Sequence, residues 1–170
     1  MLKVFMNTKE ERRKVQNVYT DELLMPGEMV LLAPNGQAVT VASYGVVVCL
    51  WDKNKSGAFM CHFLEPIIRI ADLATPRFGN VALLKGIEWM LSLCSVQSIE
   101  AQIFGGAQGD NRDKRGEDNL FLAREILQNK GIQIVSEDVG GQKGRKILLD
   151  AATGTVAVMK VHSLRQGDWL

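Results

Sequence analysis

Residues 46–52, Val46-Val47-Val48-Cys49-Leu50-Trp51-Asp52, form a continuous apolar run of largely β-branched residues that ends in an aspartate. The polar, turn-forming stretch 52–57 closes this run, and a second apolar run follows at residues 58–64. Two short apolar runs joined by a tight polar turn are typical of a β-hairpin, and the lack of polar alternation indicates burial on both faces. The sequence therefore predicts a buried hairpin over residues 46–64.

Short strands are also predicted on the N-terminal side of this hairpin. Residues 29–32 and 38–42 are apolar runs separated by Pro34-Asn35-Gly36. Asn-Gly pairs suit the positive φ angles of tight turns. We therefore expect two strands joined by a tight turn at this point.

On the C-terminal side, helices and strands alternate. Apolar residues recur every three or four positions over residues 80–95, which predicts an amphipathic helix with Asn80 as its N-cap. A second helix is predicted over residues 120–130, ended by Gly131 as a glycine C-cap. Strands are predicted at residues 98–104, 132–135, 146–149 and 155–161. Helices in the middle and hairpins on either side favour an α/β class protein, a layered α/β sandwich with a mixed β-sheet.

The composition fits a single globular domain and argues against several classes of ligand. The chain has 170 residues, of which 46% are hydrophobic and 23% are charged, and its net charge is +1. A balanced charge argues against a nucleic-acid partner. The three cysteines form no paired motif, and His62 and His162 lie in unrelated contexts, so neither metal nor cofactor is expected. The sequence predicts neither a signal peptide nor a membrane-spanning run, so we expect a cytoplasmic protein with no membrane insertion.

Several motifs in one order resemble the CheD family, the chemoreceptor glutamine deamidases of chemotaxis. The matching stretches are residues 46–52, Gly57-Ala58, His62-Phe63-Leu64 with Pro66, residues 100–107, Gly116 with Asn119, and residues 137–146. The resemblance covers a CheD-like domain at residues 19–161, with a charged N-terminal segment at 1–18 and a C-terminal tail at 162–170. The charge run at residues 9–14 is interpreted as solvated and without function of its own.

The resemblance implies a reaction and partners. Members of this family hydrolyse glutamine side chains of methyl-accepting chemoreceptors to glutamate, with a cysteine nucleophile, a histidine base and a threonine that orients the histidine. His62 falls on the family's histidine. The implied partners are the cytoplasmic domain of a chemoreceptor and a CheC-type phosphatase.

Two positions depart from this pattern. Counting back from residues 46–52 without a gap, Gly45 occupies the position of the nucleophilic cysteine, and a glycine cannot attack an amide. Val39 falls on the threonine position, with Thr40 beside it. Because neighbouring strand residues point to opposite faces, Thr40 can replace the hydroxyl only if a bulge or a one-residue slip intervenes. Lost or impaired catalysis is therefore the preferred hypothesis, with the receptor-binding role retained.

Two alternatives remain open. In one, Cys49 replaces the nucleophile and works with His62; Cys49 lies on the same strand face as Gly45, about 13 Å along the strand from it. In the other, the scaffold binds an anion or a small molecule through the opened Gly45 site and the glycine loops. Tyr44, Gly105, Gly106 and Ala107 are predicted to approach the substrate, because the family's glycines lie near the active site, although they can also serve as backbone turns.

Overall fold

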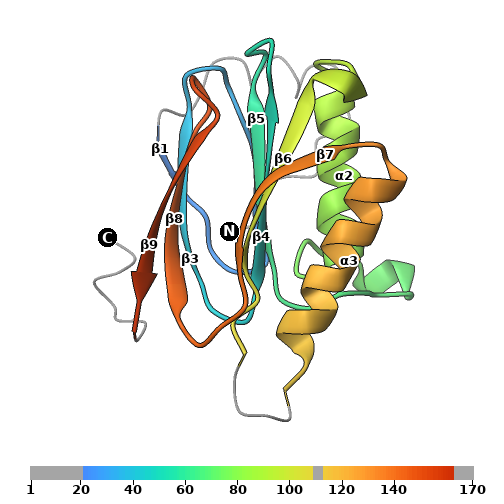
Figure 1. Cartoon of the computed structure of the whole chain (residues 1–170). Helices are drawn as coiled ribbons and strands as arrows, with labels where there is room; N and C mark the ends of the chain where they lie inside the picture. Colours follow the sequence, from blue (N-terminus) through green and yellow to red (C-terminus); the bar gives the residue numbers. More distant parts are fainter. Residues whose placement is uncertain (1–20, 109–112, 163–170) are drawn as a thin grey trace.

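The structure is a computed structural model that describes residues 21–108 and 113–162. Two β-sheets lie face to face, and two long helices cover the outer side of one of them (Figure 1). The strands are β1 (Asp21–Leu23), β2 (Met29–Leu32), β3 (Gln37–Ala42), β4 (Val46–Asp52), β5 (Ala58–Phe63), β6 (Ile99–Gly105), β7 (Gln133–Val139), β8 (Gly144–Asp150) and β9 (Thr155–Val161). The helices are α2 (Gly79–Leu91) and α3 (Arg115–Asn129), with short 3-10 turns at Ala71–Leu73 and Val96–Ser98.

Both sheets are mixed. The four-stranded sheet has the order β1-β3-β8-β9, and the five-stranded sheet has the order β2-β5-β4-β6-β7. β1 is parallel to β3 and β7 is parallel to β6, whereas the other neighbours are antiparallel. The predicted α/β sandwich with a mixed sheet is therefore confirmed.

The unbroken apolar run of β4 is explained by two cores, one on each side of the five-stranded sheet. Val46, Val48 and Leu50 belong to the core beneath α2 and α3, whereas Val47 and Cys49 belong to the core between the sheets. β4 pairs with β5 in an antiparallel hairpin, as the sequence predicted. A central strand covered on both faces has no position for a polar side chain, which accounts for the missing alternation.

The predicted turn at Asn35-Gly36 forms, but it does not close a hairpin. The Gly36 amide donates to the Ala33 carbonyl over 2.9 Å, and Gly36 has no positive φ. The strands on either side belong to different sheets, because β2 pairs with β5 and β3 pairs with β8. The turn therefore carries the chain from one layer of the sandwich to the other, which local sequence patterns cannot reveal.

The helices begin at positions other than those predicted. Helix α2 starts at Gly79, and the Asn80 side chain does not cap it. Instead, the Asn80 amide exchanges hydrogen bonds with both the backbone N–H and the carbonyl of Ile68, at 3.1 and 2.9 Å. Helix α3 starts at Arg115, five residues before the predicted start. The C-cap is confirmed, because Gly131 has φ 69° and its amide donates to Gln128.

Candidate active site

His62 lies between the two sheets, where it is almost completely buried. It is the penultimate residue of β5, opposite Val47 of β4, and its exposed fraction is 1%. Its Nδ1 is 3.0 Å from the Thr40 hydroxyl, which belongs to the other sheet. Burial lowers the pKa of His62 to about 4, so the imidazole is neutral near pH 7.

Thr40, and not Val39, supplies the hydroxyl beside His62, so the expectation that this group is missing is wrong. β3 and β8 stay in register from Gln37 to Ala42, which directs Thr40 inward together with Ala38 and Ala42. Val39 points to the opposite face and is half-buried. The pairing of β3 with β8 shows no bulge over these residues. Of the three positions that the resemblance implies, position 45 is then the one that lacks the expected kind of side chain, and the catalytic role of these positions stays a prediction.

Gly45 faces the other ring nitrogen of His62. A Cβ atom built on Gly45 would lie 2.6 Å from His62 Nε2 and 2.8 Å from Leu64 Cδ2. Both distances are shorter than real Cβ contacts, so the ring occupies space that a side chain at position 45 would need. The backbone at Gly45 does not itself require glycine, because its φ is not positive.

The unpaired nitrogen of His62 therefore has no reactive partner. Among the described residues, Nε2 is buried and makes no hydrogen bond. A histidine activates a thiol or hydroxyl only within about 3 Å of it. The residue that faces Nε2 is Gly45, which has a hydrogen atom in place of a side chain. Nε2 of this neutral, oriented imidazole is therefore paired with neither a thiol nor a hydroxyl of the described residues.

The glycines at the end of β6 hold the turn that carries Gly45. The amides of Gly106 and Ala107 donate to the carbonyls of Gly45 and Ser43, both over 2.9 Å. Gly105 has φ 96°, and a Cβ there would collide with the Gly45 carbonyl. These contacts show a structural role for the three residues. Their predicted approach to a substrate stays a prediction.

Cys49 lies on the same face of the hairpin as His62, but it is not opposite to it. The register places Val47 opposite His62 and Cys49 opposite Met60, so Gly45 and Cys49 each lie two residues from that pairing. Cys49 is 1% exposed in the core between the sheets. Burial raises the pKa of its thiol well above the usual value, and the nearby Cys61 adds to this. Such a thiol does not ionise near neutral pH.

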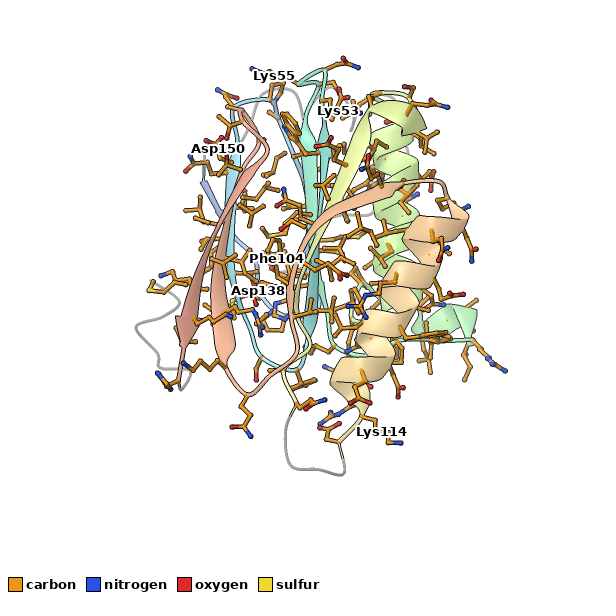
Figure 2. The ribbon with its side chains drawn as sticks, in the orientation of Figure 1. Lys53, Lys55, Phe104, Lys114, Asp138 and Asp150 are labelled. Atoms are coloured by element: carbon orange, nitrogen blue, oxygen red, sulfur yellow. The ribbon has the colours of Figure 1, made fainter. Side chains whose placement is uncertain are left out.

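A second polar link joins the sheets on the same side of the core as His62. Arg145 of β8 is 2% exposed, and its Nη2 donates to Asp138 Oδ1 of β7 over 2.9 Å. Asp138 is paired in register with Phe104, and both lie between the sheets in Figure 2. The sequence analysis included Arg145 only in the stretch 137–146 that resembles the family, and nothing in it indicated that this side chain is buried.

Charged and aromatic side chains surround the turn at residues 43–45. The guanidinium carbon of Arg115 is 4.4 Å from the centre of the Tyr44 ring. Arg115 also forms ion pairs with Asp113 at 2.7 Å and with Glu65 at 3.8 Å. Sequence patterns did not single out Arg115, because the contact joins segments about seventy residues apart in the chain.

No metal site or membrane-spanning helix is found in the part of the chain that the structure describes. No group of three or more His, Cys, Asp or Glu side chains is arranged there to hold a metal ion. None of the described helices is both long and apolar enough to cross a membrane. The charge run at residues 9–14 lies outside the described residues.

Comparison with known proteins identifies the family. The family model described as CheD chemotactic sensory transduction matches residues 69–160, more than half of the chain. The chain belongs to the CheD family. Curated CheD proteins named probable chemoreceptor glutamine deamidase are similar over most of their length. The one from Sulfurimonas denitrificans is 38% identical over 129 residues, which are 72% of this chain and 83% of that protein.

Two further relatives show the same extent of similarity. The CheD protein of Trichlorobacter lovleyi is 35% identical, over 78% of this chain and 86% of its own length. That of Thermococcus kodakarensis, also named probable chemoreceptor glutamine deamidase, is 32% identical over 72% and 84%. The resemblance deduced from the motifs is thus confirmed at the level of the family.

Replacing Thr40 with valine is expected to lower the free energy of unfolding by about 1 to 3 kcal/mol, because Nδ1 of a buried histidine loses its partner. Thr40→Ser is the matched variant, because it keeps the hydroxyl and loses the methyl group that valine retains, and it should cost less than Thr40→Val. Urea denaturation of both variants gives the comparison. A loss in Thr40→Ser as large as that in Thr40→Val would contradict the prediction, because only the serine variant keeps the hydroxyl.

Proposed function

We propose that this CheD-family protein acts in chemotaxis by binding chemoreceptors in the cytoplasm without hydrolysing their glutamine side chains. The relatives are named probable chemoreceptor glutamine deamidases, which supports a chemoreceptor as partner. A CheC-type phosphatase is the second partner that we propose, on the basis of the family resemblance alone.

The observation that carries the proposal is the contact between Gly45 and His62. Thr40 and His62 form the hydrogen-bonded pair expected of an oriented base. The residue that faces Nε2, however, has no side chain, and the ring fills the space next to it. Binding depends on the surface, whereas turnover depends on a nucleophile at this point. Receptor binding can therefore persist in this chain without turnover.

Use of Cys49 as a substitute nucleophile is the alternative, and its surroundings argue against it. Its thiol is packed in the core between the sheets and its pKa is raised by burial. His62 directs its unpaired nitrogen toward Gly45. A working thiol would need both ionisation and access to a glutamine side chain.

The test combines binding and turnover in one sample. The protein is mixed with cytoplasmic fragments of chemoreceptors from the same genome, and association is followed by calorimetry. Conversion of glutamine to glutamate is followed by mass spectrometry of receptor peptides. We expect association without conversion, under conditions in which a CheD relative that carries the cysteine converts the same fragments. Conversion at a comparable rate would contradict the proposal, and its loss in Cys49→Ala would then identify the nucleophile.

A further inference from the structure

Five side chains form a connected cluster around the turn that carries Gly45. We call Tyr44, Glu65, Arg77, Asp113 and Arg115 the rim cluster. Arg115 stacks on the Tyr44 ring at 4.4 Å and pairs with Asp113 at 2.7 Å. Glu65 lies between the two arginines, 3.8 Å from Arg115 Nη1 and 3.5 Å from Arg77 Nη2. The cluster therefore joins the turn, the end of β5 and the start of α3.

The rim cluster lies directly beside the candidate site. Tyr44 precedes Gly45 in the chain, and Glu65 follows Leu64, whose side chain borders the Gly45 position. The amides of Leu64 and Glu65 both donate to the carbonyl of Arg77, at 2.8 and 3.1 Å. His62 itself is 1% exposed. The charged side chains of the rim cluster are partly exposed, whereas the imidazole beside them is buried.

Arg115 is fixed in place and still has donors to offer. Its Nε and Nη2 donate to the Asp113 carboxylate over 2.7 to 3.2 Å. Within the described part of the chain, Nη1 makes no hydrogen bond and has only the 3.8 Å ion pair with Glu65. The side chain is 46% exposed. A guanidinium already held by one carboxylate and one ring loses little freedom when it binds a partner.

We infer that the Tyr44–Arg115 pair is the anchor for the chemoreceptor, an inference that rests on the proposed function. The partner is a receptor helix with glutamine or glutamate side chains. Arg115 Nη1 donates to a side-chain oxygen of that helix, and the Tyr44 ring packs against the methylene groups. Tyrosine and arginine are among the residue types that most often dominate the binding energy of interfaces. The pair gives this chain a recognition surface that does not depend on a nucleophile.

The test measures binding of variants to a receptor cytoplasmic fragment by calorimetry. We expect Arg115→Ala and Tyr44→Ala to weaken binding roughly tenfold or more, and Tyr44→Phe to bind within about twofold of the parent. Arg124→Ala is the matched control, because Arg124 lies on the same helix, is 44% exposed and pairs with Glu137 at 2.9 Å. It should bind like the parent. Thermal unfolding of each variant separates a lost contact from a lost fold.

A receptor fragment whose exposed glutamines and glutamates are changed to alanine tests the chemistry of the contact. Binding to this fragment should be equally weak for the parent and for Arg115→Ala. If both Tyr44→Ala and Arg115→Ala fold and bind the unaltered fragment like the parent, the inference is overturned. An equal loss in Arg124→Ala also overturns it, since any surface arginine would then serve. If the parent protein binds no receptor fragment, the proposed function itself fails.

Discussion

Gly45→Cys is expected to fold less stably than the parent, by about 1 to 2 kcal/mol, and to show no deamidase activity. The new Cβ would lie 2.6 Å from His62 Nε2 and 2.8 Å from Leu64 Cδ2. Overpacking of a core costs about 1 to 3 kcal/mol, whereas replacing glycine stabilises by only about 0.4 to 1 kcal/mol through the unfolded chain. The end of Leu64 can move, but the imidazole is buried and bonded to Thr40. The clash therefore outweighs the gain.

Urea denaturation and receptor deamidation measure the two parts of this prediction. Gly45→Ala is the matched variant, because it adds the same Cβ without a thiol and should lose similar stability. In a His62→Ala background the ring is gone, so Gly45→Ala should cost less than it does in the parent. A Gly45→Cys variant that is as stable as the parent and deamidates receptor would contradict the prediction, and would show that the imidazole moves aside for the missing residue.

The sequence predicted those parts of the fold in which local pattern and burial agree. The run at residues 46–52 gave a buried strand because both of its faces pack against apolar layers. The sequence could not predict which strand pairs with β3, since the pairing of distant strands depends on how the two layers of the sandwich pack. Asn80 shows the same limit: its amide serves the backbone of Ile68, a contact that no local capping rule includes.

In the candidate site, the sequence identified His62 and the glycine that faces it, because both follow from an ungapped match to a family motif. It placed the family's threonine position on Val39, with Thr40 beside it, because counting along the chain does not show which of two neighbouring residues faces the histidine. Alternation would have favoured Thr40, which has the small inward residues Ala38 and Ala42 on either side. The Tyr44–Arg115 contact had no sequence signal, since the two residues approach only in the folded chain.

Acidification from about pH 6.5 to pH 4 is expected to remove about 3 kcal/mol of stability through His62 alone. The pKa of His62 is lowered from 6.5 to about 4 in the folded protein, because burial disfavours the imidazolium. Above pH 6.5 both states hold a neutral ring, so His62 does not make stability depend on pH. Below pH 6.5 the imidazole is protonated in the unfolded chain but stays neutral in the folded protein. Each pH unit over which this difference persists lowers the free energy of unfolding by about 1.4 kcal/mol. Thr40 bonds Nδ1 of the ring and Gly45 faces Nε2, and neither residue titrates.

Urea denaturation at several pH values between 4 and 8 measures this slope, and two variants isolate its source. His62→Gln cannot take up a proton, so its stability should change much less over this range, whatever its stability at pH 7. His162→Gln removes an exposed histidine and should keep the slope of the parent. The pKa values of Asp52, Asp113 and Asp138 are lowered from 3.8, so the stability they contribute is lost mainly below pH 4. A parent protein with the same stability at pH 7 and pH 4.5 would mean that His62 accepts a proton without unfolding, and therefore that the site opens to water.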